Sequence, residues 1–167
     1  MSKSYRTVLG SLDNYEKGRI EIVDDDPKHY AFSNVFEVAS VSKPYEKVAV
    51  GINREYVIET LRVEGTSSWF AAAHDESVTV MDGDLEIRLR KLGDGDVELP
   101  EGGSVSLPGE PSGSKMGVIR AKRGHMALLP AGASYQFHAD RPGVVLLQSI
   151  QGPETVFKWA QIARVQA

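Results

Sequence analysis

The 167-residue sequence contains no cysteine, which excludes disulfide bonds, thiolate metal ligands and a cysteine nucleophile. It has no apolar stretch approaching the roughly 18 residues that a membrane helix needs, so we expect no membrane partner. The N-terminus also lacks a long apolar run, and we therefore expect no secretory signal. The absence of cysteine fits the reducing conditions of a cytoplasmic location.

Clustered positive charge is missing as well. No basic run is longer than Lys122-Arg123, and the formal net charge is −4 with a pI near 5.6. Because nucleic acids bind a basic face, we expect no nucleic acid as a partner. Two catalytic signatures are also absent: the Gly-x-Ser-x-Gly of hydrolases and a glycine loop that cradles phosphate before a helix.

The residues that are present predict one all-β domain spanning 1–167. Turn signals separate short stretches of alternating apolar residues, and the clearest alternation places Leu85, Ile87 and Leu89 on one face. We expect strands at 19–23, 47–52, 55–65, 68–73, 77–81, 84–92, 116–121, 125–130, 134–139 and 143–150. Many short strands of this kind are typical of a sandwich or barrel.

Three segments depart from the strand pattern. Residues 93–114 are rich in glycine, proline, serine and acidic residues, which predicts a long surface loop. Residues 154–164 follow Gly152-Pro153 and carry an apolar stripe, which predicts a short C-terminal helix. Residues 33–39 are compatible with a short helix capped by Ser33 and equally with a strand.

Two regions carry motif-like spacing. In the first, six residues separate Glu76 from Gly83 at a predicted turn. In the second, five residues separate Gly124 from Pro130-Ala131-Gly132, and Tyr135 follows with Phe137 on the same face of the next strand. Pro130 ends a strand because it cannot donate to the ladder, and Gly132 suits the turn conformation. Strand, tight turn and strand are therefore expected here.

Together these regions resemble the cupin superfamily, which implies a jelly-roll (double-stranded β-helix) barrel. Cupins that bind metal carry two histidines shortly before the motif glutamate and a third histidine where Tyr135 stands. In this sequence the first two positions fall, depending on the register, on Phe70 and Ala72, on Trp69 and Ala71, or on Ala71 and Ala73. No register supplies two histidines, and Ala139 replaces the final asparagine of the second motif.

Ligand chemistry predicts a metal-free barrel. Iron, nickel and zinc in such barrels are held mainly by neutral imidazole, and a phenol binds well only when ionised. We expect a degenerate pocket formed by Trp69, His74, Glu76, Tyr135 and Phe137. His74 should face the same side as Glu76, either as a displaced ligand, as an acid–base partner or as a hydrogen-bonded structural residue.

The remaining histidines and acidic residues are expected to be structural. His125 should lie at the rim of a turn, His138 should face away from Tyr135, and His29 should lie in a solvated turn. The acidic run Asp24–Asp26 is interpreted as a solvated loop rather than a hard-cation site.

A closer resemblance covers residues from about 5 to 162. The stretches at 29–40, 43–59, 71–76 and 124–152 and the terminal KWAQI are similar to the small subunit of the two-subunit hydroquinone 1,2-dioxygenases. That resemblance implies an Fe(II)-dependent enzyme that cleaves hydroquinone with O₂ to a hydroxymuconic semialdehyde. It also implies that a larger cupin-containing subunit carries the iron, that this chain has no cofactor, and that two of each subunit form a heterotetramer.

Two readings of different class therefore stand. The first is a required but non-catalytic subunit, whose interface would draw on aromatic residues among Tyr5, Tyr30, Phe32, Phe36, Trp69, Phe70 and Trp159. Among these we single out Trp69, which could wall the barrel mouth or extend toward the partner's substrate, a small aromatic diol. The second is a stand-alone cupin, either a weak-metal enzyme using His74, Glu76 and Tyr135 or a small-molecule-binding barrel. In either case the predicted N-terminal strand at 19–23 could be exchanged between two copies of this chain to form a dimer.

Overall fold

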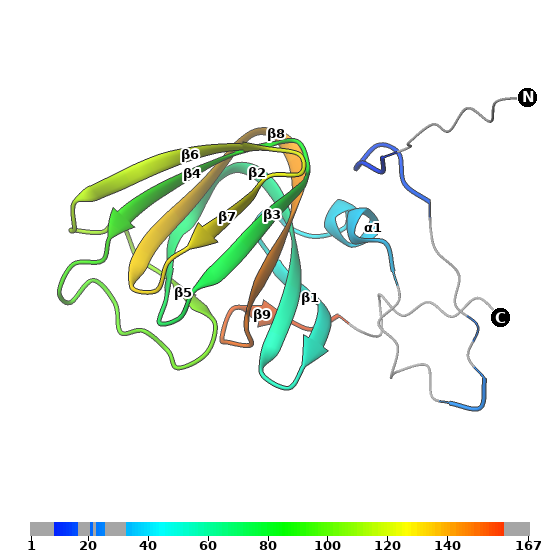
Figure 1. The fold of residues 1–167 in the computed structure, drawn as a ribbon, viewed down its shortest axis with the longest axis horizontal. Helices are drawn as coiled ribbons and strands as arrows, with labels where there is room; N and C mark the ends of the chain where they lie inside the picture. Colours follow the sequence, from blue (N-terminus) through cyan, green and yellow to red (C-terminus); the bar gives the residue numbers. More distant parts are fainter. Residues whose placement is uncertain (1–8, 17–20, 22, 26–32, 159–167) are drawn as a thin grey trace, which may run out of the picture.

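The structure is a computed structural model that describes residues 9–16, 21, 23–25 and 33–158. Within this part the regular secondary structure consists of β-strands and one short helix (Figure 1). The elements are α1 (Val35–Ser40), β1 (Lys47–Asn53), β2 (Tyr56–Ala72), β3 (Glu76–Asp82), β4 (Asp84–Lys91), β5 (Ser104–Ser106), β6 (Lys115–Lys122), β7 (Met126–Leu129), β8 (Ala133–Ile150) and β9 (Thr155–Val156). The predicted all-β class is confirmed, with the described strands joined in a single sheet.

Two long antiparallel strands, β2 and β8, organise the sheet (Figure 1). The first half of β8 pairs with β4, which pairs with β6, whereas the second half of β8 pairs with β3, which pairs with β7. On its other edge β2 pairs with β1 near its start and with β5 near its end. Each long strand therefore takes part in two groups of strands, and the sheet curls around an interior as a jelly roll requires.

Each of these long strands corresponds to two strands that the sequence predicts separately. Irregular stretches lie at the breaks that the sequence suggested, including Gly65 with a φ of 69°. The pairing nevertheless continues across them, with register shifts between Val63 and Gly65 and between Thr66 and Trp69. Bulges of this kind bend a strand without ending it, so the turn-like residues mark bends rather than strand ends.

The core fills the inside of the curled sheet. Leu85 and Ile87 of β4 are buried, as the alternation predicts, while Glu86 and Arg88 lie on the outer face and pair with each other. The same cluster draws on β2, β3, β6, β7 and β8. Because alternate residues of every strand face inward, one apolar core connects both groups of strands.

Helix α1 covers part of the outer face of the sheet. The side chain of Asn34 caps it by accepting a hydrogen bond from the backbone N–H of Phe36 (2.9 Å), while Ser33 donates instead to Glu37. Phe36 and Ala39 then pack against Val144 of β8. Of the two alternatives for 33–39 the helix is therefore correct, although its cap lies one residue later than predicted.

The predicted C-terminal helix is wrong over the described residues. Gly152 accepts a hydrogen bond from the N–H of Thr155 (3.1 Å), which closes a turn, and Thr155–Val156 then pair in parallel with Lys47–Val48 of β1. Two β-branched residues beside a free strand edge favour this pairing over a helix that would begin at Glu154. Residues 159–164 lie outside the described part of the chain.

Two further segments differ in detail from expectation. The region 93–114 contains β5, which pairs with the end of β2, between turns and bends. Of the predicted strand at 19–23 only Glu21 and Val23 are described, and neither belongs to a strand. Among the described helices none is long and apolar enough to span a membrane.

Candidate functional site

Glu76 and Tyr135 meet inside the barrel. Glu76 is the first residue of β3 and Tyr135 lies near the start of β8, and their exposed fractions are only 1% and 2%. The Tyr135 hydroxyl donates to Glu76 Oε2 (2.6 Å), and the Ser149 hydroxyl donates to Glu76 Oε1 (2.6 Å). Both carboxylate oxygens therefore have a protein hydroxyl as partner.

The ammonium group of Lys47 completes this centre. Lys47 opens β1 and is buried (3% exposed), with Nζ donating to Ser104 Oγ and to the Tyr135 hydroxyl (3.4 Å). Nζ also lies 4.2 Å from the centroid of the Phe70 ring, within range of a cation–π interaction. Sequence reasoning missed this residue, because a lysine at the start of an alternating strand normally faces solvent.

The structure selects one of the three registers for the missing histidines. Phe70 is the cross-strand neighbour of Tyr135, the two ring centroids are 5.8 Å apart, and Phe70 and Ala72 are both buried. Trp69 lies on the opposite face of β2, where it lines an outer pocket. The two histidine positions of a metal-binding cupin therefore correspond here to Phe70 and Ala72.

Burial dominates the electrostatics of the centre. It lowers the pKa of Lys47, and the charges of Glu76 and Glu59 oppose that change. Burial also raises the pKa of Tyr135 well above its ordinary value, and the charge of Glu76 and the hydrogen bond to it add to the rise. Tyr135 is therefore a neutral phenol at physiological pH. Burial raises the pKa of Glu59 to about 7.

These residues do not fit the metal that the cupin fold commonly holds. Phe70 and Ala72 offer no donor atom, Tyr135 keeps its proton, and both oxygens of Glu76 accept hydrogen bonds from hydroxyls. Within the described residues no group of three or more histidine or carboxylate side chains is arranged to hold a metal ion. Transition metals need several imidazole or carboxylate donors, and this centre offers one carboxylate.

His74 lies beside this centre without joining Glu76 directly. Its Nε2 is 3.1 Å from Ser149 Oγ and 3.3 Å from the backbone nitrogen of Ile150. Its Nδ1 is buried and has no hydrogen-bond partner among the described residues. Ser149 therefore stands between His74 and Glu76, an arrangement that supports a structural role for His74.

The remaining predicted pocket residue, Phe137, belongs to the core. It is fully buried, and its ring centroid is 5.1 Å from that of Tyr135. The turn residues lie where the motif spacing puts them: Gly83, Gly124 and Gly132 all have positive φ, and Pro130 follows β7. At Gly83 a side chain would also come within 3.1 Å of the Gly143 Cα, so a close approach of two chain segments adds to the backbone requirement.

Two other histidines and the start of the acidic run are described, and all of them lie away from the Glu76–Tyr135 centre. His125 Nδ1 accepts from the backbone N–H of Lys122 (3.0 Å) in the turn before β7. His138 lies on the outer face, where its ring contacts Thr66 and Asp140. Asp24 lies in a bend. His29 and Asp26 fall outside the described residues.

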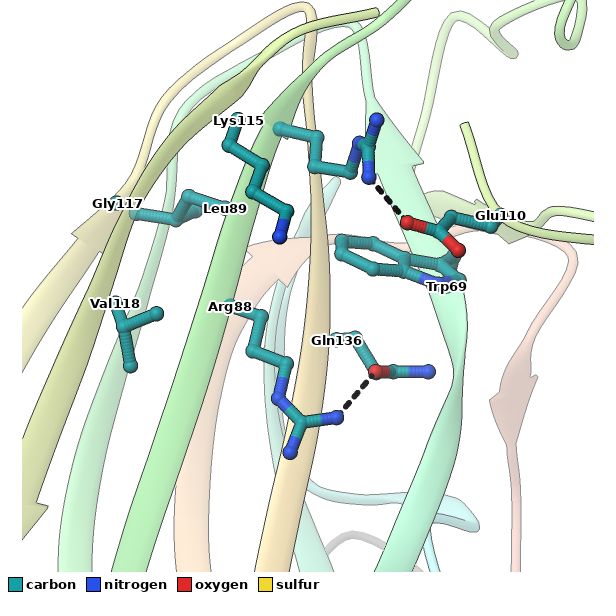
Figure 2. A pocket seen from close by; sticks show the side chains of 9 residues that line it. Trp69, Arg88, Leu89, Glu110, Lys115, Gly117, Val118 and Gln136 are labelled. Atoms are coloured by element: carbon teal, nitrogen blue, oxygen red, sulfur yellow. Dashed lines mark hydrogen bonds and ion pairs between the residues drawn. The ribbon is translucent and has the colours of Figure 1, made fainter. Parts of the chain in front are cut away.

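The outer face of the sheet holds a pocket of about 470 Å³ beside Trp69. Trp69, Gln136, Arg88 and Val118 are successive cross-strand neighbours on β2, β8, β4 and β6 (Figure 2). Arg88 donates to the Gln136 side chain (3.1 Å). Trp69 therefore faces away from the barrel interior, and its prediction as part of the degenerate inner pocket is wrong, because period-2 alternation directs Phe70 inward instead.

The other aromatic residues predicted for an interface fall into two groups. Phe70 is buried in the barrel core, and Phe36 is buried where α1 packs against the outer face of the sheet. Tyr5, Tyr30, Phe32 and Trp159 lie outside the described residues. Among those described, Trp69 is the candidate that remains.

Comparison with solved structures identifies close relatives. One is hydroquinone 1,2-dioxygenase from Sphingomonas sp. TTNP3 with 4-hydroxybenzoate bound, at 53% identity and a TM-score of 0.92, covering 98% of this chain and 100% of that chain. Another is hydroquinone 1,2-dioxygenase PnpCD in complex with Cd²⁺ and 4-hydroxybenzonitrile, at 53% identity and a TM-score of 0.88, covering 97% and 98%. No family model and no curated protein matches the chain.

A longer chain of PnpCD, from its complex with Fe³⁺, shares only the fold. It is 11% identical with a TM-score of 0.61, and the match covers 89% of this chain but 42% of the longer one.

Proposed function

The chain belongs to the hydroquinone 1,2-dioxygenase family, and from that premise we propose that it is the small, non-catalytic subunit of such an enzyme. The enzyme would cleave hydroquinone with O₂ to a hydroxymuconic semialdehyde at an Fe(II) centre on a larger cupin-containing subunit, with two of each subunit in the assembly. The observation that carries this proposal is the barrel centre itself. There the Tyr135 hydroxyl donates a hydrogen bond to Glu76 and accepts one from Lys47. The three side chains offer no set of metal ligands.

Comparison with PnpCD supports the larger partner. One PnpCD chain matches along 98% of its length, whereas another matches along only 42% of its length and at 11% identity. The same enzyme therefore contains a chain of this size and a longer chain with a similar fold in part of it. A division of roles, with metal chemistry in the longer chain, accounts for the loss of ligands in the shorter one.

Trp69 is the residue we assign to the interface with the partner's substrate site. Its indole is partly exposed on the outer face and lines the same pocket as Arg88 and Lys115 (Figure 2). Aromatic and arginine side chains of this kind contribute most to many protein interfaces, and an indole offers a flat surface to an aromatic diol.

A kinetic experiment tests the role of Trp69 in the reconstituted enzyme. Trp69→Ala should raise KM for hydroquinone, while Tyr56→Ala, which removes an exposed aromatic side chain at the other end of β2, should leave it unchanged. Equal kinetics for Trp69→Ala and the unmodified enzyme would remove Trp69 from the substrate site.

The first test of the whole proposal is the native mass of the protein isolated from its own host, with iron measured in the same fraction. We expect an assembly that contains a second, longer chain in addition to the 18.3 kDa chain. Separation of the two chains should leave the iron with the longer one. An isolated chain or homo-oligomer that carries stoichiometric iron would overturn the subunit assignment in favour of a stand-alone enzyme.

A further inference from the structure

The Lys47 ammonium lies where the metal-ligand positions of the cupin motifs converge. Phe70 stands at a histidine position, Glu76 at the motif carboxylate and Tyr135 at the third histidine position. Lys47 Nζ is 4.2 Å from the Phe70 ring centroid and 3.4 Å from the Tyr135 hydroxyl, and the charge of Glu76 acts on it more strongly than that of any other group. A residue from β1, outside both motifs, thus contacts or interacts with each of these positions.

The surroundings of Lys47 match the needs of a positive charge. An ammonium has three N–H donors and no acceptor, and here it finds the hydroxyl oxygens of Ser104 and Tyr135 and the face of the Phe70 ring. The Tyr135 hydroxyl donates its proton to Glu76, so the lone pairs of the hydroxyl oxygen are available to accept a hydrogen bond from Lys47. A fully buried cation persists only with such partners and an opposite charge nearby.

The buried negative charge of Glu76 is a second reason to expect a positive charge at this centre. Glu76 is 1% exposed and has only hydroxyl groups as hydrogen-bond donors. Hydroxyls orient a carboxylate but carry no positive charge. Lys47 brings a cationic side chain to this centre, and the Tyr135 hydroxyl is a hydrogen-bond partner of both Lys47 and Glu76.

We propose that the Lys47 ammonium is the internal cation of this barrel and that it takes the place a metal ion holds in metal-binding cupins. The inference goes beyond the subunit assignment, since it concerns residues of this chain alone. It explains the burial of Lys47, which would otherwise be costly.

A double-mutant cycle on the full chain tests the charge pairing. Lys47→Met keeps the length of the side chain and leaves Glu76 without its counter-charge, so the Tm should fall by on the order of 10 °C. Glu76→Gln should also lower the Tm, because it leaves the ammonium unpaired. The double variant Lys47→Met/Glu76→Gln should lose clearly less than the sum of the two single losses. Lys91→Met, at an exposed position, is the matched control and should melt as the unmodified chain does.

Two results of the cycle would overturn the proposal: additive losses in the double variant, or a Lys47→Met chain that is as stable as the unmodified one. If Lys47→Met does not fold, the proposal requires that the double variant does fold. Failure of both variants to fold would also overturn it.

Metal binding is tested separately by titrating the full chain with Co²⁺ and recording its visible absorption. We expect no saturable band in the unmodified chain. Stoichiometric binding that disappears in Glu76→Gln would place a metal at this carboxylate and overturn the role of Lys47. Both experiments use this chain without a partner, so a failed search for the larger subunit would leave their outcomes intact.

Discussion

Glu59 offers a quantitative test of the electrostatics inside the barrel. It lies in β2 with 2% of its surface exposed, and burial raises its pKa from 4.5 to about 7, against the opposing effects of a hydrogen bond with Thr155 and the charge of Lys47. In the unfolded chain the carboxyl is solvated and titrates near 4.5. The folded state therefore binds this proton more tightly over the interval between the two values.

The sign and size of the effect follow from proton linkage. Because the folded chain holds the proton up to about pH 7 and the unfolded chain releases it near pH 4.5, the free energy of unfolding falls as pH rises through this interval. At about 1.4 kcal/mol per pH unit, the contribution of Glu59 falls by roughly 3 kcal/mol between the two limits. Above about pH 7 the loss is complete.

Urea unfolding between pH 4.5 and 8 measures this contribution when the unmodified chain is compared with Glu59→Gln. The amide has the same size and does not titrate, so the difference in free energy of unfolding should shift by roughly 3 kcal/mol in favour of the variant as pH rises. Glu55→Gln, at an exposed position of the same hairpin, should show no comparable shift. A Glu59→Gln difference that is constant with pH would refute the reasoning.

Three further substitutions test the packing around the site. Tyr135→Phe removes the hydroxyl that donates to Glu76 and should lower the free energy of unfolding by about 1–3 kcal/mol in urea; an unchanged midpoint would mean that this hydrogen bond is not formed in solution. Phe137→Ala removes a fully buried ring and should cost about 3–5 kcal/mol by the same assay, and a loss below about 1 kcal/mol would contradict its place in the core. Gly143→Ala would bring a Cβ within 2.6 Å of the Asp82 carbonyl oxygen and should lower the Tm in thermal melting, whereas an unchanged Tm would show that β3 and β8 are less closely packed there.

Much of the fold could be predicted because local chemistry expresses it directly. Alternation along 84–92 places Leu85 and Ile87 in the core, and Gly132 lies in the turn that its spacing from Gly124 predicts. These features depend on residues within a few positions of each other. The loss of metal ligands is local in the same sense, since no histidine stands at any of the candidate motif positions.

Predictions that required long-range pairing were less successful. The stripe beginning at Glu154 resembles a helix in isolation, but the free edge of β1 pairs with Thr155–Val156 instead. The sequence alone left three registers for the missing histidines. Only the pairing of Phe70 with Tyr135 shows which side chains point inward and that Trp69 lies outside.

The sequence by itself determined that this chain is a cupin-like barrel with its metal ligands replaced, because motif spacing and residue type carry that information. Only the tertiary structure decided what replaced them. Lys47 and Glu76 are 29 positions apart on different strands, and nothing in the local pattern of β1 marks the lysine as buried. Its charge has a role only when the curled sheet brings Phe70, Glu76 and Tyr135 around it, since a side chain's electrostatic environment is a property of the folded chain.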